Sequence, residues 1–165
     1  MANDYSFDIL SKVEYQEIDN AIQQAKKDVD VRFDLRDSNS TMELSKTENK
    51  ITLNSSDTHK LKAVGEILRQ KLIKRNISLK SCVFEDAKTM GNQRAEQIVK
   101  LQQGLSQENA KEITRCVKDS KLKVQTQING DKVKIIAKKI DELQAVIRLL
   151  HAQNFEFYFT CHINN

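Results

Sequence analysis

The stretch Lys118–Lys139, KDSKLKVQTQINGDKVKIIAKK, has the clearest pattern in the sequence. Apolar and polar residues alternate on both sides of Asn129-Gly130-Asp131, which is typical of a β-hairpin closed by a tight turn. The apolar face of this hairpin is formed by Val124, Thr126, Ile128, Val133, Ile135 and Ala137. Glutamines and lysines occupy the opposite face, which is either solvated or a surface that meets phosphates.

Length and composition are those of an ordinary soluble protein of one domain or two small ones. The 165 residues include 39% hydrophobic and 30% charged residues, without an apolar run long enough to span a membrane. The N-terminus lacks the features of a signal peptide, so we expect a cytoplasmic protein. Cys82, Cys116 and Cys161 are widely spaced and form no CxxC pair, so neither a disulfide framework nor a metal site is expected.

Positive charge is concentrated in one segment. The net charge of the chain is +4, whereas residues 111–139 hold nine Lys/Arg against three acidic residues, which gives +6. A local excess of this kind favours a polyanionic partner more than the modest total does.

Strand and helix patterns alternate in the first half. A strand at Ser6–Val13 precedes a helix, and two strands at Thr41–Ser45 and Lys50–Asn54 form a hairpin. A second helix follows Ser55-Ser56-Asp57, which offers an N-cap, and ends near Asn76; residues 78–84 look extended. The apolar faces of the two helices hold Ile18, Ala21, Ile22, Ala25, Val29 and Phe33, and Leu61, Val64, Leu68 and Leu72.

The second half repeats this order. A strand at Glu96–Gln103 precedes a helix capped by Ser106; the hairpin follows, then a helix capped by Asp141 and a last strand at Phe155–Cys161. At an offset of 82 residues, apolar positions of the third strand and second helix coincide, for example Ile51 with Val133 and Leu61 with Leu143. The shared spacing indicates an internal duplication.

Each half therefore reads β-α-β-β-α-β. This order predicts an α+β fold of two ferredoxin-like halves, each an antiparallel sheet with both helices on one face. We expect the halves at 1–84 and 96–165, joined by a connection at 85–95 that has no clear periodicity.

Several segments together resemble the bacterial YajQ family. They are SFDILSKV at 6–13, the Asn20-Ala21 step, RFDLR at 32–36, KDSKLKVQTQINGDKVKI at 118–135 and DELQAVI at 141–147. The resemblance spans nearly the whole chain. It implies two ferredoxin-like domains and allows an exchange of N-terminal strands between the halves. It also implies binding of purine nucleotides or RNA, or reception of cyclic di-GMP with a signal passed to a protein partner such as a transcription regulator.

Arg32 and Arg36 are the first candidate ligand residues. If RFDLR is extended, the two guanidinium groups lie on one side about 7 Å apart and could grip a phosphodiester. The alternative is that one of them pairs with Asp34, Asp30 or Asp37 in a surface network.

The basic hairpin is the second candidate region, through Lys118, Lys121, Lys123, Gln125 and Gln127. Lysines on a strand face are usually only solvated. Here the two glutamines share a face with lysines, and amides can contact base edges while ammonium groups contact phosphates. The third strand of each half lacks the aromatic residues with which RNA-recognition modules stack bases.

The sequence contains no phosphate-cradling glycine loop, metal-ligand spacing or nucleophile–base arrangement. We therefore expect a non-enzymatic nucleotide-, cyclic dinucleotide- or RNA-binding protein that needs no cofactor. The alternative is a structural or adaptor protein whose basic face contacts another protein.

Overall fold

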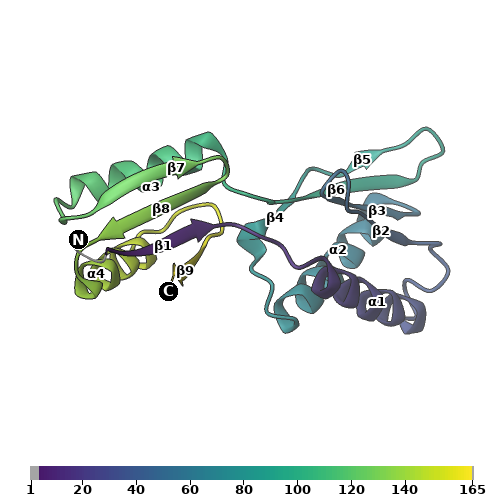
Figure 1. Ribbon diagram of the computed structural model, residues 1–165. Helices are drawn as coiled ribbons and strands as arrows, with labels where there is room; N and C mark the ends of the chain where they lie inside the picture. Colours follow the sequence, from purple (N-terminus) through teal and green to yellow (C-terminus); the bar gives the residue numbers. More distant parts are fainter. Residues whose placement is uncertain (1–3, 165) are drawn as a thin grey trace. The chain divides into compact units, whose positions relative to one another are not determined.

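The computed structural model describes residues 4–164, which contain two antiparallel β-sheets and four α-helices (Figure 1). The expected α+β class is confirmed. Contacts within the chain define two compact units. The middle unit is Val13–Gln102, and the terminal unit combines residues up to Lys12 with residues from Gln103 onward.

The middle unit contains two long helices and a sheet of short strands. Its helices are α1 (Tyr15–Val31) and α2 (Thr58–Lys74). The sheet has the order β2-β3-β6-β4, with β5 also paired to β6. The strands are β2 (Thr41–Ser45), β3 (Lys50–Ser55), β4 (Cys82–Phe84), β5 (Lys88–Thr89) and β6 (Ala95–Leu101), and a 3₁₀ turn at Leu79–Ser81 precedes β4.

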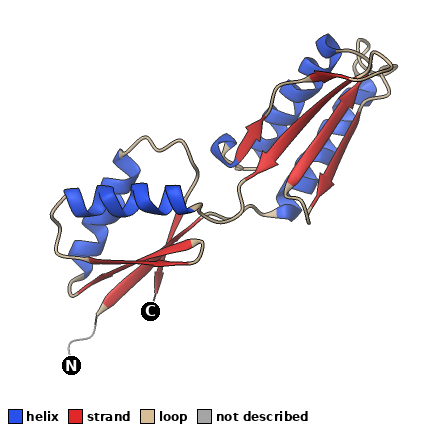
Figure 2. Cartoon of the chain, turned by 90° about the horizontal axis from the view of Figure 1, so that it is seen from above, coloured by secondary structure: helices blue, strands red, loops and turns tan. Residues whose placement is uncertain are grey.

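The terminal unit has a sheet of the order β7-β8-β1-β9. Its elements are β1 (Tyr5–Leu10), α3 (Gln107–Asp119), β7 (Gln125–Asn129), β8 (Lys132–Ala137), α4 (Ile140–Ala152) and β9 (Thr160–Asn164). Figure 2 shows its two helices on one side of the sheet, so the opposite face of the sheet carries no helix of this unit.

Alternation within the strands explains which sheet face is buried. In the terminal unit, Phe7 and Ile9 of β1 lie opposite Ile135 and Val133 of β8, and all four side chains are fully buried. Burial of each such side chain contributes about 1.5–3 kcal/mol. In β3 the same period of two buries Ile51 and Leu53 against the helices of the middle unit.

The hairpins β2–β3 and β7–β8 occupy equivalent places in the two sheets. Each forms one edge, and its second strand pairs with a strand from elsewhere in the chain: β3 with β6, and β8 with β1. The topology therefore agrees with the equivalence that the 82-residue offset predicted. The duplication itself remains an inference.

The unit boundaries differ from the expected division into 1–84, 85–95 and 96–165. The strand β6 lies between β3 and β4 of the middle unit, while β1 lies between β8 and β9 of the terminal unit. Residues 85–95 do not connect two halves, because they hold β5 and lead into β6 within one sheet. Periodicity identifies a strand but not the sheet in which it finds hydrogen-bond partners.

Three local expectations are also corrected. Phe33 lies beyond the end of α1 and is 83% exposed instead of packing in the core. The last strand begins at Thr160, and residues 155–159 are irregular although their aromatics alternate. Helix α4 begins after Lys139 without a side-chain cap, so Asp141 lies in its first turn instead of capping it.

Other boundaries follow the sequence closely. Asp57 caps α2 by accepting a hydrogen bond from the Lys60 amide at 2.7 Å, and Ser106 caps α3 by accepting one from Asn109 at 3.0 Å. Asn76, just after α2, adopts a left-handed conformation with φ of 62°, which ends the helix where expected. No helix among the described residues has both the length and the apolarity that a bilayer crossing requires.

Candidate nucleotide site

The basic segment runs from the end of α3 through the β7–β8 hairpin. Lys118 is exposed in the last turn of α3, and Lys121 follows it in a turn with a φ of 60°. Lys123 is exposed just before β7. The turn between the strands contains Gly130 with a φ of 62°, as expected for an Asn-Gly-Asp hairpin turn.

The glutamines lie on the helix-free face of the terminal sheet. In the hairpin, Gln125 is opposite Ile136 and Gln127 is opposite Lys134, and both glutamines are exposed. Thr126 faces the other way, toward the core, opposite the buried Ile135. The expected sharing of one face by Gln125 and Gln127 is therefore present in the structure.

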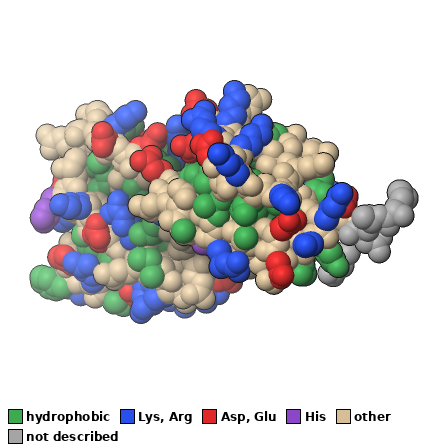
Figure 3. All heavy atoms as spheres, turned by 90° about the vertical axis from the view of Figure 1, so that its left-hand side faces the viewer, with side chains coloured by type: hydrophobic (Ala, Val, Ile, Leu, Met, Phe, Trp, Pro, Cys, Tyr) green, Lys and Arg blue, Asp and Glu red, His purple; other side chains and the backbone are tan. Residues whose placement is uncertain are grey.

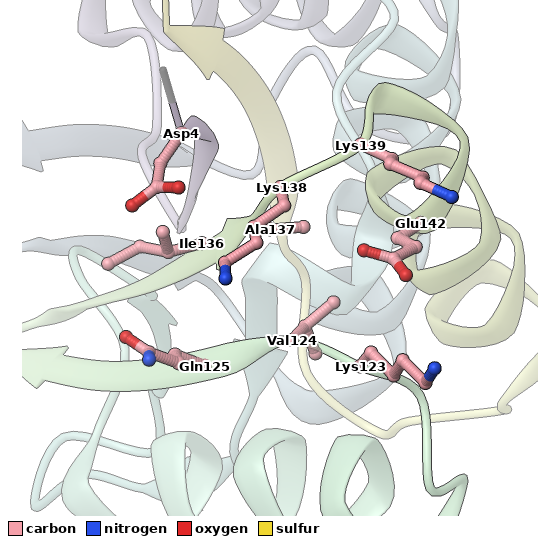
Figure 4. A pocket seen from close by; sticks show the side chains of 9 residues that line it. All are labelled: Asp4, Lys123, Val124, Gln125, Ile136, Ala137, Lys138, Lys139 and Glu142. Atoms are coloured by element: carbon pink, nitrogen blue, oxygen red, sulfur yellow. The ribbon is translucent and has the colours of Figure 1, made fainter. Parts of the chain in front are cut away.

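A pocket of about 440 Å³ opens where the hairpin strands meet the start of α4. We call it the hairpin pocket (Figure 4). Its lining residues are Asp4, Lys123, Val124, Gln125, Ile136, Ala137, Lys138, Lys139 and Glu142. In Figure 4 the side chains of Lys123, Lys139 and Glu142 lie on one side of the pocket, with Asp4, Gln125 and Ile136 on the other. The pocket thus joins two predicted site residues, Lys123 and Gln125, to several that were not predicted.

The lysines of the hairpin pocket form no ion pair with another described residue. Within residues 4–164, Lys123, Lys138 and Lys139 take part in no ion pair. Two carboxylates, Asp4 and Glu142, moderate the positive charge of the pocket. Figure 3 shows one face of the molecule, where basic side chains alternate with acidic and apolar ones. The feature that could attract an anion is therefore the local cluster of ammonium groups of Lys123, Lys138 and Lys139.

The pocket combines groups that a nucleotide requires. Val124, Ile136 and Ala137 supply apolar surface, on which a planar base can pack. The Gln125 amide can donate to and accept from a base edge, and the lysines can contact phosphate oxygens. The remaining predicted lysines, Lys118 and Lys121, do not line the pocket.

Lys138 and Lys139 were missed as site residues by the sequence analysis, although both lie in the quoted stretch. The signal that could have found them is the hairpin register. Because Gln125 pairs with Ile136, the residues just before β7 and just after β8 lie at the same end of the hairpin. Lys123 and Lys138 are therefore brought together by the register.

Arg32 and Arg36 belong to the middle unit, and the extended geometry that was considered for RFDLR is not the one that the structure shows. Residues 33–37 form a turn, in which the Arg36 amide donates to the Arg32 carbonyl at 2.9 Å. The Arg32 guanidinium makes two hydrogen bonds to Asp34, at 3.0 and 2.8 Å, and Arg36 stacks on Phe33 at 4.9 Å. Hydrogen bonding to Arg32 holds the pKa of Asp34 below its usual value. Of the two readings of this segment, the geometry favours the surface ion pair.

The described residues offer no metal site and no base-stacking platform. No group of three or more potential metal-ligating side chains comes together among them. The helix-free faces of the inner strands carry no aromatic side chain in either sheet. These positions are Lys132, Lys134, Ile136, Ser6, Asp8 and Leu10 in one sheet and Lys50, Thr52, Asn54, Glu96, Ile98 and Lys100 in the other.

The cysteines are free thiols with raised pKa values. Burial raises the pKa of Cys161 to about 11 and also raises the pKa of Cys82 and of Cys116. A thiol that stays protonated at neutral pH is a poor nucleophile. The structure therefore provides no activated cysteine.

A family model described as "Nucleotide-binding protein YajQ-like" matches residues 5–164. The chain belongs to the YajQ family. The resemblance seen in the sequence is thereby confirmed over nearly its whole length.

Curated relatives of this YajQ-family chain are about half identical to it. A protein of Solibacter usitatus is 48% identical over 152 residues, covering 92% of both chains. A protein of Alkaliphilus oremlandii is 47% identical over 150 residues, covering 91% of both, and one of Trichodesmium erythraeum is 48% identical over 155 residues, covering 94% of both. All three are named nucleotide-binding protein.

The segments that resemble the YajQ family have different structural roles in this chain. RFDLR forms the turn after α1, where Leu35 is buried in the core of the middle unit. The segment at 118–135 leads into the hairpin and supplies Lys123, Val124 and Gln125 to the hairpin pocket. DELQAVI at 141–147 supplies Glu142 to the same pocket, whereas RFDLR does not line it.

Proposed function

We propose that the protein binds a nucleotide in the hairpin pocket, with Lys123, Lys138 and Lys139 on the phosphates. The observation that carries this proposal is a set of three lysines that form no ion pair within residues 4–164 and that line a partly apolar pocket. The pocket volume of about 440 Å³ is within the range of about 300–1,000 Å³ typical of small-molecule sites. The names of the curated relatives support the same ligand class.

Gln125 contributes base contacts in this proposal. Its amide lies beside Ile136, so a base packed on the apolar floor is within reach of both a donor and an acceptor. Lys118, Lys121 and Gln127 extend the basic surface beyond the pocket. A ligand longer than one nucleotide, such as a cyclic dinucleotide or a short RNA, would engage them as well.

Calorimetric titration of the purified protein with GTP, ATP, cyclic di-GMP and a short RNA tests the proposal. We expect Lys123→Ala and Lys138→Ala each to weaken binding of the best ligand by about tenfold and to reduce its salt dependence, because each removes one phosphate contact. Gln125→Ala is expected to weaken binding without changing the salt dependence. Failure of all four ligands to bind at moderate salt would refute the proposal and favour the adaptor alternative.

Lys62→Ala is a matched control. Lys62 is an exposed lysine of α2 in the middle unit, so its removal changes the net charge equally without touching the pocket. Arg32→Ala and Arg36→Ala test the second candidate region. In this proposal all three leave the Kd unchanged, whereas a loss of affinity in the arginine variants alone would move the site to the middle unit.

The proposed function includes binding without turnover. Of the acidic residues of the pocket, Asp4 precedes β1 and Glu142 lies in α4, and neither is accompanied by a nucleophile or a metal-ligand cluster within the described part of the chain. We expect no release of phosphate from GTP or ATP by highly purified protein. Sustained release that a Glu142→Gln substitution abolishes would contradict this expectation.

A further inference from the structure

The turn of the β7–β8 hairpin contains the one Asn-Gly step of the chain, at Asn129-Gly130. Asn129 is the last residue of β7 and lies opposite Lys132, the first residue of β8, so a short loop joins the two strands. Both residues of the Asn-Gly step are exposed. The hairpin pocket lies at the other end of these strands, because Lys123 precedes β7 and Lys138 follows β8. The turn therefore takes no part in the proposed nucleotide site.

An asparagine followed by glycine carries a nucleophile and an electrophile in adjacent residues. Attack of the Gly130 amide nitrogen on Cγ of Asn129 forms a cyclic imide and breaks the bond from Cγ to Nδ2. The side-chain nitrogen leaves as ammonia and takes up the proton that the Gly130 amide loses. Water then opens the imide. Cleavage at Cγ gives aspartate, whereas cleavage at the main-chain carbonyl gives isoaspartate, in which the main chain runs through the former side chain. One water is consumed and one ammonia is released, without an oxidant or a cofactor.

The structure leaves both reacting groups accessible. Gly130 has no side chain, and no atom lies within 4 Å of the position that a Cβ atom would occupy, so the approach to its nitrogen is open. Among the hydrogen bonds of residues 4–164, none is donated by the Gly130 amide and none involves the Asn129 side chain. A base in the solvent can therefore remove the amide proton, and the side chain is free to turn toward the nitrogen.

Other asparagines that precede a small residue are restrained. Asn20 and Asn109 lie within the helices α1 and α3, where the backbone amides are hydrogen-bonded. Asn39 and Asn54 are both held by Arg94, which donates to the Asn39 carbonyl at 2.7 Å and to Asn54 Oδ1 at 2.8 Å. In the part of the chain that the structure describes, no such restraint acts on the asparagine of the β7–β8 turn.

Isoaspartate would add a main-chain atom to a turn that organises the terminal unit. The Asp131 carbonyl accepts a hydrogen bond from the Leu105 amide at 3.0 Å and so ties the turn to the loop before α3. Two residues further on, Val133 is fully buried opposite Ile9 of β1. An extra atom just before Asp131 displaces its carbonyl from Leu105 and disturbs the register of the hairpin. Aspartate leaves the main chain unchanged and adds only a negative charge at an exposed position.

We propose that Asn129 is a site of spontaneous modification, and that its isoaspartate form lowers the stability of the terminal unit but not of the middle unit. The middle unit is spared because it has its own core. The reaction needs no enzyme, so its extent increases with the age of each molecule. The proposal does not depend on nucleotide binding, because the hairpin pocket lies at the opposite end of the strands.

Incubation of the full-length protein at neutral and at mildly alkaline pH tests the chemistry. Mass spectrometry of proteolytic peptides follows the replacement of the amide by an acid, and labelling with an isoaspartate methyltransferase measures the isoaspartate. We expect loss of the amide at Asn129, faster at the higher pH because the deprotonated Gly130 nitrogen attacks. Asn92 is the internal reference. It is also exposed, but it precedes Gln93 and its Oδ1 accepts from the Arg94 amide at 3.2 Å, so it should keep its amide over the same period.

Two variants separate the effect of the altered main chain from that of the charge. Asn129→Gln blocks the reaction, because the longer side chain closes a ring far more slowly. Asn129→Asp reproduces the new charge without the extra main-chain atom. Hydrogen exchange measures stability within each unit. The aged unmodified sequence should lose protection over residues 125–137 and keep it in the middle unit, whereas aged Asn129→Gln and fresh Asn129→Asp should keep it in both.

Three results would overturn the proposal. The first is retention of the Asn129 amide for as long as the Asn92 amide, which would show that the folded turn prevents ring closure. The second is unchanged protection of the terminal unit in protein that contains isoaspartate at position 129. The third is an equal loss of protection in aged Asn129→Gln, which would assign the ageing to another position.

Discussion

At the scale of single residues, Gly104 shows how one position holds a unit together. Its amide donates to the Ser11 carbonyl at 2.6 Å, and the next amide, of Leu105, donates to the Asp131 carbonyl at 3.0 Å. The loop before α3 is thus tied both to the end of β1 and to the turn of the β7–β8 hairpin. Gly104 has a φ of 85°, which favours glycine.

Gly104→Ala is expected to destabilise the protein by about 1–3 kcal/mol. A Cβ atom would come within 2.5 Å of Asp131 Oδ2 and 2.8 Å of its Cβ, so rotation of the Asp131 side chain cannot relieve the overlap. Urea unfolding measures the change. Gly91→Ala is the control, because Gly91 has no atom within 4 Å of the corresponding position, and it should change stability by less than about 0.5 kcal/mol. Equal effects of the two substitutions would contradict the argument.

Site residues were only partly predictable from the sequence. The alternation in the hairpin correctly placed Gln125 and Gln127 on one face, because strand geometry depends on local order. The conformation of RFDLR depends on the burial of Leu35 in the core, which no local pattern encodes. Lys138 and Lys139 join the pocket through cross-strand register, so they could be found only after the hairpin had been paired.

At the scale of elements, the second helix of each unit, α2 or α4, begins in a different way. Helix α2 begins after Asp57, whose carboxylate accepts from the Lys60 amide, whereas α4 begins after Lys139 without a side-chain cap. The first-turn acids of α4, Asp141 and Glu142, act on the helix dipole instead.

Asp57→Ala should therefore cost about 1 kcal/mol of stability, the typical value for loss of an N-cap. Asp141→Ala removes the same charge from the first turn of α4 but breaks no capping bond, and it should cost only about 0.3–1 kcal/mol at low salt. Thermal or urea unfolding in high salt separates the two, because salt screens the dipole effect but leaves the capping hydrogen bond. A larger loss for Asp141→Ala at high salt would be inconsistent with these roles.

Strand boundaries show where element prediction ends. Alternating aromatics at 155–159 suggested a strand, but these rings pack on one another and on α4 instead. The ring centroids of Phe155 and Phe157 are 4.9 Å apart, and those of Phe159 and His151, in α4, are 5.3 Å apart. Strand β9 pairs with β1 only from Thr160 onward, opposite Leu10. The next residue after Leu10 is Ser11, and its carbonyl already accepts a hydrogen bond from the Gly104 amide. The end of one strand is thus set by the path of another.

At the scale of the whole molecule, the two units differ in continuity. The middle unit is one continuous segment with its own core, whereas the terminal unit needs residues from both sides of it. Sequence periodicity predicted the fold class, both hairpins and four helices. It could not assign β1 and β6 to their sheets. Each of these strands has a pattern that is compatible with pairing to the second strand of either hairpin, β3 or β8.

A fragment of residues 13–102 should therefore fold alone, whereas a fragment of residues 1–84 should not, because it lacks β6 between β3 and β4. Circular dichroism and amide NMR dispersion of the two fragments measure this directly. A folded 1–84 fragment beside a disordered 13–102 fragment would restore the division expected from the sequence.

The position of β1 inside the terminal sheet also has a consequence for synthesis of the protein. The ribosome makes β1 before the whole middle unit, and its neighbours β8 and β9 only afterwards. At roughly 5–20 residues per second, β1 waits on the order of ten seconds with both edges unpaired and with Phe7 and Ile9 unburied. During translation the growing chain therefore carries an unpaired strand with exposed apolar side chains, N-terminal to a unit that can already fold. Such a strand is a natural target for chaperones that bind nascent chains.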